Sequence, residues 1–183
     1  QLIADVRTAY QSEQRELKWC DECQEINLWT YWQGRRHLDA RIMLVGQDWG
    51  CPWDAGAAEV MRNVQAMNRG QSIGYMRENE NSTDRNLIEL FHSIGFDILT
   101  DDPCLFFTNF VMGYRVKGAS GNFKKSWAAA DAEYFRRLVE IIRPRILLCL
   151  GKDTWKSVLG CFGGTISNKM SYNRVIESEK NPV

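Results

Sequence analysis

Short apolar runs alternate with amphipathic helical patterns along most of this chain, and this alternation constrains the fold more than any other feature. The runs are Arg41–Gly46, Cys104–Val111 and Arg145–Leu150, and each has the length and composition of a strand buried on both faces. Strands that alternate with helices favour a mainly parallel sheet with helices on both faces. The sequence therefore predicts a three-layer α/β/α fold, with residues 1–183 forming a single domain.

Five helices are expected between and around these strands. They span Leu2–Trp19, Gly56–Met67, a segment from Ser82 or Thr83 to Gly95, Ser126–Ile142 and Lys152–Leu159. In the third, Leu87, Leu90, Phe91 and Ile94 share one face, and Gly95 supplies the left-handed residue that ends a helix. Pro144 ends the fourth, because proline cannot continue a helix.

Charge and cysteine usage limit the classes of function. Lys and Arg number 23, as do Asp and Glu, so no overall field attracts nucleic acid or an acidic membrane, and any DNA binding needs a local patch. No apolar run approaches the roughly 20 residues that span a bilayer, and the polar start at Gln1 does not resemble a secretory signal. Cys104 and Cys149 lie inside apolar runs, which indicates free thiols in a reducing compartment, so we expect a cytoplasmic protein without a membrane partner.

The loop Val45–Pro52 carries the first candidate site. It follows a predicted strand and combines Gly46 and Gly50 with the carboxylate of Asp48. Glycine permits close approach of backbone N–H groups to a ligand, and a carboxylate can orient or deprotonate water. An ordinary tight turn with a solvated Asp48 is the alternative.

Asn109 closes the apolar part of the second run, so its side chain is expected at the same sheet edge as Asp48. Ligands bind at the carboxyl ends of parallel strands, and an amide offers both the donor and the acceptor needed to recognise a pyrimidine edge. We expect Asp48 and Asn109 to point into one slot that holds a single base. A buried asparagine that only satisfies backbone groups remains the alternative.

Together with a third segment, Ile142–Gly151, these residues resemble the uracil-DNA glycosylase superfamily. The shared features are the Gly46-Gln47-Asp48 sequence, an asparagine that ends a middle strand, and an Ile-Arg-Pro segment before a strand that ends in Leu-Gly. The stretch Asp39–Gly46 is similar to the first strand of the iron–sulfur branch of that superfamily. The resemblance covers about Cys20 to Gly160 and implies a central, mainly parallel four-stranded sheet.

The resemblance also implies a DNA repair hydrolase that cleaves the N-glycosidic bond of a flipped-out uracil or damaged base without a redox cofactor. Asp48 would then be the water-activating carboxylate, Gln47 would lie against the base through its backbone, and Asn109 would read the uracil edge beside Gly46. Tyr75, Trp49 or Trp53 would supply the aromatic face under the base, although ordinary packing explains each of them equally well.

Two features depart from the superfamily. Cys20 and Cys23 match one cysteine pair of the iron–sulfur branch, but the later pair is missing, so we expect no cluster; His37 or Cys51 would be needed to complete a zinc site. The histidine-containing catalytic motif near the C-terminus also has no counterpart. Either that motif lies beyond Val183 in a longer protein, or the chain lacks the activity.

Basic residues near the predicted strand ends are candidate contacts to DNA phosphates, namely Arg115, Lys117, Lys124, Lys125 and Lys152. A solvated charged loop explains them equally well. Two other functions remain open: a catalytically inactive nucleic-acid or nucleotide-binding module of the same fold, and an unrelated open-sheet protein that binds a phosphate-bearing small molecule.

Overall fold

A computed structural model of the chain describes residues 1–12, 15–19, 36–49, 62, 66, 69, 82–100, 104–115 and 122–164. The helix expected at Gly56–Met67 lies almost entirely outside these residues, as does the loop that follows it. All statements below concern the described part of the chain.

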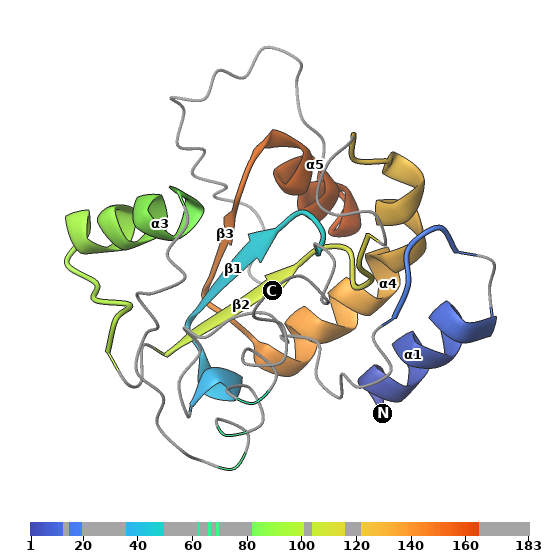
Figure 1. The fold of residues 1–183 in the computed structure, drawn as a ribbon, viewed down its shortest axis with the longest axis horizontal. Helices are drawn as coiled ribbons and strands as arrows, with labels where there is room; N and C mark the ends of the chain where they lie inside the picture. Colours follow the sequence, from blue (N-terminus) through green and yellow to red (C-terminus); the bar gives the residue numbers. More distant parts are fainter. Residues whose placement is uncertain are drawn as a thin grey trace.

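The centre of the fold is a parallel sheet whose strands are β1 (Ile42–Gly46), β2 (Leu105–Asn109) and β3 (Ile146–Cys149). The strand order is β2-β1-β3, so the first strand in the chain is the central one (Figure 1). Leu44 pairs with Phe107 on one side and with Leu148 on the other. The predicted parallel sheet is therefore confirmed for three strands, and the expected fourth strand is not among the described residues.

One face of the sheet is covered by α1 (Leu2–Ser12), α4 (Lys125–Ile142) and α5 (Lys152–Cys161) (Figure 1). Met43, Val45 and Phe106 point into this layer, where they pack against apolar side chains of the helices such as Phe135. Phe135 and Phe110 stack with ring centroids 4.6 Å apart. Burial of each side chain of this size stabilises the fold by about 1.5–3 kcal/mol. The cluster on this face is the larger of the two, so it supplies most of the core.

The other face is covered by α3 (Ser82–Ser93), where Leu87 and Phe91 pack on Leu44 and Leu105. Helices on both faces confirm the layered α/β organisation (Figure 1). Leu90 and Ile94 were expected on the same buried face, but they are 44% and 65% exposed. The buried stripe of α3 is therefore narrower than the periodicity predicted.

Helix ends follow the predicted chemistry in two places. Gly95 has a φ of 76° and follows α3, and Phe96 N–H donates to the Phe91 carbonyl across this turn. At the end of α4, Arg143 adopts the left-handed conformation (φ 52°) directly before Pro144. Glycine takes this conformation without strain, whereas arginine does so at a cost.

The first helix is shorter than predicted. It ends at Ser12 rather than near Trp19, and Lys18 instead forms an antiparallel bridge with Tyr114. The prediction over-extended the helix because Leu17 continues the apolar spacing, although Leu17 is buried from a bend outside the helix. In the described part of the chain, no helix is long and apolar enough to cross a membrane.

Candidate functional site

The carboxyl ends of β1 and β2 meet at one edge of the sheet, where Gly46 and Asn109 are register partners. A Cβ on residue 46 would overlap Oδ1 of Asn109 and lie 3.2 Å from its Cγ. Any larger residue at position 46 would therefore displace the amide. The absence of a side chain at Gly46 lets Asn109 lie directly over the backbone of the neighbouring strand.

The side-chain amide of Asn109 has hydrogen-bond donors and an acceptor that no described residue uses. Asn109 is 7% exposed, and within the described part of the chain no group hydrogen-bonds to its side chain; only its main-chain carbonyl accepts a bond, from Thr108 Oγ1 at 3.4 Å. A primary amide carries two donor hydrogens and an acceptor oxygen. Among the described residues, only Nε1 of Trp19 is a fully buried side-chain polar atom without a partner, so the amide atoms of Asn109 reach the surface and are open to a ligand that supplies complementary groups.

Asp48, two residues beyond β1, is held by a two-point ion pair. Nε of Arg115 donates to Oδ2 of Asp48, and Nη2 donates to Oδ1 at 3.1 Å. The two side chains are only 7% and 8% exposed. The guanidinium also lies over the ring of Trp127 in α4, 5.1 Å from the ring centroid. Fork-to-fork pairing fixes both the position and the orientation of the carboxylate.

The loop that follows β2 runs beside the loop that follows β1. Val111 N–H donates to the Gln47 carbonyl at 3.1 Å, and Arg115 N–H donates to the Trp49 carbonyl at 3.1 Å. Gln47 is half-buried and Trp49 is 6% exposed. The backbone of the first loop thus aligns the second, which places Arg115 next to Asp48.

A buried polar network holds the same loop from the helix side. Asp131 of α4 is fully buried and accepts bonds from Tyr10 Oη, from Met112 N–H at 2.7 Å and from Arg15 Nη1 at 2.5 Å. Tyr10 Oη in turn accepts from Gly113 N–H at 2.9 Å. Burial raises the pKa of both Tyr10 and Asp131 above their ordinary values, in Asp131 against the opposing effect of these donors. The loop between β2 and Arg115 is therefore fixed at two successive backbone amides.

Sequence reasoning missed this network, although one signal was present. Asp131 occupies the apolar face of α4 together with Ala128, Phe135 and Leu138. An acidic residue at a core position of an amphipathic helix needs a partner, because burying an unpaired charge is costly. The partners come from remote segments, so the sequence did not identify them.

Asn109 and Asp48 have different neighbours. A Cβ on Gly46 would lie 3.6 Å from Phe107, whose ring packs with the cluster on the α3 side, so the amide of Asn109 belongs to that side. Asp48 is tied through Arg115 to Trp127, which packs with the cluster on the α4 side. The two side chains share no hydrogen bond, so the expected single slot is not formed by direct contact between them.

The predicted phosphate contacts fall into two groups. Arg115 is buried in the ion pair with Asp48, which makes it a positioning residue for that carboxylate and not a surface contact. Lys124 is exposed and pairs with Glu16, 2.6 Å away. Lys125 and Lys152 are exposed at the first turns of α4 and α5. These two lysines remain candidates for a surface that contacts DNA.

Other candidates lie outside the described residues. They are Tyr75, Lys117, Cys20, Cys23, Cys51 and Trp53. His37 is 5% exposed and lies beside the ring of Phe106, 6.1 Å between centroids. The described residues contain no cluster of three or more histidine, cysteine or acidic side chains that could hold a metal ion.

Comparison with known proteins gives no relative: no protein-family model matches the chain, and no curated protein matches it either.

Proposed function

We propose that this chain is a DNA N-glycosylase of the uracil-DNA glycosylase type, which hydrolyses the bond between the sugar and a flipped-out uracil or damaged base. The observation that carries the proposal is the amide of Asn109, which lies over Gly46 at the carboxyl end of a parallel sheet without a partner among the described residues. A target base must leave the helical stack before an enzyme can reach its glycosidic bond. Such an enzyme therefore needs a protein group that recognises the exposed edge of the base.

The chemistry of Asn109 matches the edge of uracil. Uracil presents two carbonyl acceptors and one ring N–H donor, and the amide can donate to a carbonyl while it accepts from the N–H. Cytosine presents an amino donor where uracil has one of its carbonyls, so the same amide orientation would leave a buried donor facing a donor. Mismatched buried polar groups of this kind discriminate strongly between ligands.

Asp48 would act on the sugar side of the base. Because Asn109 faces the α3 side and Asp48 the α4 side, this requires the nucleotide to lie across the ends of β1 and β2 rather than in a slot on one face of the sheet. A carboxylate has about four acceptor positions, and Arg115 occupies two of them, which leaves capacity to orient one water molecule. In the reaction the water oxygen bonds to C1′ while the C1′–N1 bond breaks and its electron pair leaves with the uracil. Asp48 accepts the proton of the attacking water, and its negative charge favours the positive charge that grows on the sugar.

A surface for the DNA strand is available at the same end of the sheet. Lys125 and Lys152 are exposed at the start of α4 and α5, the ends of these helices that adjoin the carboxyl ends of the strands. The thiols of Cys104, Cys149 and Cys161 are unpaired, as expected in the reducing cytoplasm where we place the protein.

A second function is favoured by one observation: the guanidinium of Arg115 offsets the charge of Asp48. A carboxylate whose two oxygens are both engaged by a buried guanidinium suits a structural role, as expected for a nucleic-acid or nucleotide-binding module that keeps the fold without catalysis. Of the two histidines, His37 is buried beside Phe106 and His92 lies on α3, so neither adjoins Asp48 as a second catalytic group.

The test is an incision assay on oligonucleotides that carry one uracil, with wild type, Asp48→Asn and Asn109→Ala. Asp48→Asn is expected to lower the cleavage rate by about 100-fold or more, as for loss of a general base. Asn109→Ala is expected to weaken selection of uracil over cytosine. Glu140→Gln, an exposed change near the C-terminal end of α4, is the matched control and should cleave at the wild-type rate.

Three results would each lead to a different conclusion. Full activity in Asp48→Asn would remove Asp48 from the mechanism. Wild type that binds the oligonucleotide without cleaving it would favour the binding module. No binding at low salt, where phosphate contacts are strongest, would exclude both and favour a protein that binds a phosphate-bearing small molecule.

A further inference from the structure

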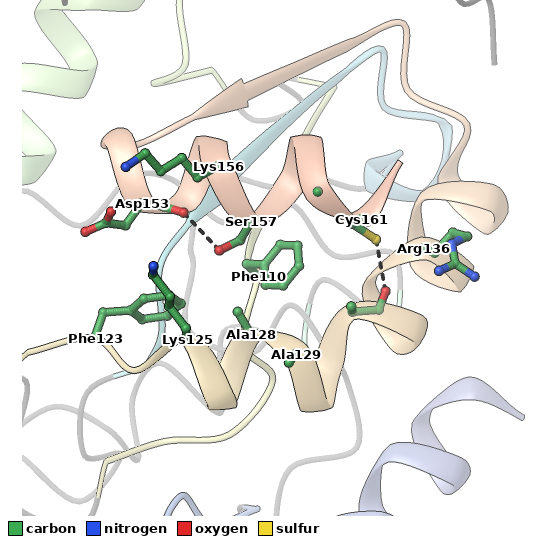
Figure 2. Close-up of a pocket in the computed structure, with 12 residues that line it drawn as sticks. Phe110, Phe123, Lys125, Ala128, Ala129, Arg136, Asp153, Lys156, Ser157 and Cys161 are labelled. Carbon is green, nitrogen blue, oxygen red and sulfur yellow. Dashed lines mark hydrogen bonds between the residues drawn. The ribbon is translucent and has the colours of Figure 1, made fainter. Parts of the chain in front are cut away.

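A groove runs between α4 and α5 on the outer surface of the helical layer, with a volume of about 510 Å³. Its floor is Phe110, and its walls are formed by one side of each helix (Figure 2). Lys125 and Lys156 lie at the end where both helices begin, whereas Cys161 lies at the other end. The groove is separate from the Asn109 and Asp48 edge.

The groove is open because the helices present small side chains to it. Ala128, Ala129 and Ala132 line it from α4, and Gly160 lines it from α5. A Cβ built on Gly160 has no heavy atom within 4 Å, so neither packing nor backbone conformation requires glycine at this position. Glycine destabilises a helix interior relative to alanine. Gly160 weakens α5 and leaves the groove unfilled. Its presence is explained if the open groove has a function.

The rim of the groove is positively charged. Three cations and one acid line it: Lys125, Lys156 and Arg136 against Asp153. Arg136 is paired with Glu133, but in the described part of the chain neither lysine has a carboxylate within ion-pair distance. A carboxylate, sulfonate or phosphate group between the two lysines would therefore meet two positive charges, with the carboxylate of Asp153 at the same end of the groove (Figure 2).

We propose that this groove binds a small organic anion, with its anionic head at Lys125 and Lys156 and its apolar body along Ala132 and Gly160 towards Cys161. A volume of about 510 Å³ lies within the range of small-molecule sites, roughly 300–1,000 Å³. The charged groups lie at both ends, Lys125, Lys156 and Asp153 at one and Arg136 beside Cys161 at the other, with an apolar stretch between them (Figure 2). An apolar lining with a few placed charged groups is the usual pattern of such sites. The proposal does not depend on the function proposed above, although the two share Lys125.

A nucleic-acid strand fits the groove less well. Binding of single strands without sequence preference relies on exposed aromatic rings on which successive bases stack. The ring of Phe110 is 1% exposed and forms the floor, and Phe123, the other aromatic residue of the lining, is half-buried and packs edge-on with Trp127. The small alanine and glycine side chains along the groove offer an apolar surface for a slender aryl or acyl chain instead.

Two matched probes test the charge and the shape of the site separately. Anilinonaphthalene sulfonate is anionic, whereas N-phenylnaphthylamine has a similar aromatic body without the charge, and both fluoresce on binding. Lys125→Gln with Lys156→Gln should weaken binding of the anionic probe by about 10-fold, with less effect at high salt, and leave the neutral probe unchanged. Lys152→Gln, the neighbouring exposed lysine outside the groove, should change neither.

Gly160→Leu is expected to abolish binding of both probes by filling the groove. Gly160→Ala keeps the fold, because its Cβ meets open space, and should weaken both probes to a smaller extent. Circular dichroism and thermal unfolding verify that each variant is folded. Decanoate and naphthyl phosphate, used as competitors, distinguish a site for acyl carboxylates from a site for aryl phosphates.

Protection of Cys161 gives a second readout. Its thiol donates to the Ala132 carbonyl at 3.1 Å at the far end of the groove, so a bound probe should slow its alkylation by N-ethylmaleimide. The proposal is overturned if neither probe binds saturably, if Gly160→Leu binds them as wild type does, or if Lys152→Gln weakens binding as much as the double lysine variant. Displacement of the anionic probe by an oligonucleotide, but by neither small competitor, would assign the groove to nucleic acid instead.

Discussion

Tyr10 of α1 and Asp131 of α4 are joined by a buried hydrogen bond although they are 121 residues apart in the sequence. Each also accepts a hydrogen bond from the loop after β2, Tyr10 from Gly113 N–H and Asp131 from Met112 N–H. The same loop carries Arg115, which fixes Asp48. The position of the candidate catalytic carboxylate therefore depends on a pair of residues that do not contact it.

Replacement of the buried acid should destabilise the fold. Asp131→Asn is expected to lower the free energy of unfolding by about 3 kcal/mol, because it removes a buried carboxylate that accepts bonds from Tyr10, Arg15 and the Met112 amide. Urea denaturation measures this change. Glu140→Gln, an exposed change on the same helix, should stay within about 0.5 kcal/mol of wild type. A loss below about 1 kcal/mol in Asp131→Asn would show that the network contributes little.

The tyrosine in this network should make stability depend on alkaline pH. Burial raises the pKa of Tyr10 in the folded protein, so its contribution is fully present below the ordinary tyrosine pKa of about 10 and is lost as pH rises above it. The free energy of unfolding should fall by up to about 1.4 kcal/mol per pH unit there. Tyr10→Phe lacks the phenol and should lose this part of the pH dependence. Identical slopes in the two proteins between pH 9 and about 11 would contradict the assignment.

A double-mutant cycle tests the close fit of Gly46 and Asn109. Gly46→Ala is expected to cost about 1–3 kcal/mol, because its Cβ would overlap Oδ1 of Asn109. In an Asn109→Ala background the same change should cost much less, since the overlapping atom is gone. Chemical denaturation of the four proteins gives the coupling energy, which should exceed about 0.5 kcal/mol for two residues in contact. Additive effects would mean that the two residues do not meet.

The thiol of Cys149 should react slowly. Burial raises its pKa to about 11, so at pH 8 about one thiol in 1,000 is ionised, against roughly a quarter for a free cysteine. Alkylation by iodoacetamide, followed on the peptide that contains Cys149 by mass spectrometry, should keep accelerating up to pH 10. In urea the rate should level off near pH 9, and a folded protein with the same plateau would contradict the expected shift.

Local patterns predicted the sheet well because each strand is a short apolar run. Burial on both faces, which was expected of all three runs, holds for β1 and β2 but not for β3, whose Ile146 is 55% exposed. The ends of α3 and α4 were also predicted, from Gly95 and Pro144, because the backbone constraints of glycine and proline are local. The length of α1 was wrong because the apolar spacing continues to Leu17, and spacing alone does not separate a buried helical residue from one buried outside the helix.

The candidate site was harder to predict than the fold. The register of β1 and β2 brings Gly46 and Asn109 together as expected from the strand ends. The ion pair between Asp48 and Arg115 was not foreseen, because Arg115 looked like one of several basic residues in a loop. The side chain of Arg115 is buried because it lies over Trp127 and because the Tyr10–Asp131 network holds the amides of its loop. Both are tertiary contacts that leave no local pattern in the sequence.

The long sequence separation of Tyr10 and Asp131 also sets an order of events during synthesis. The ribosome completes α1 and β1 before α4, so the partner of Tyr10 is added to the chain only 121 residues later. Contacts this far apart form late and slowly. Until α4 has been translated, the strand ends, including Gly46 and Asn109, therefore lack the contacts of the Tyr10–Asp131 network.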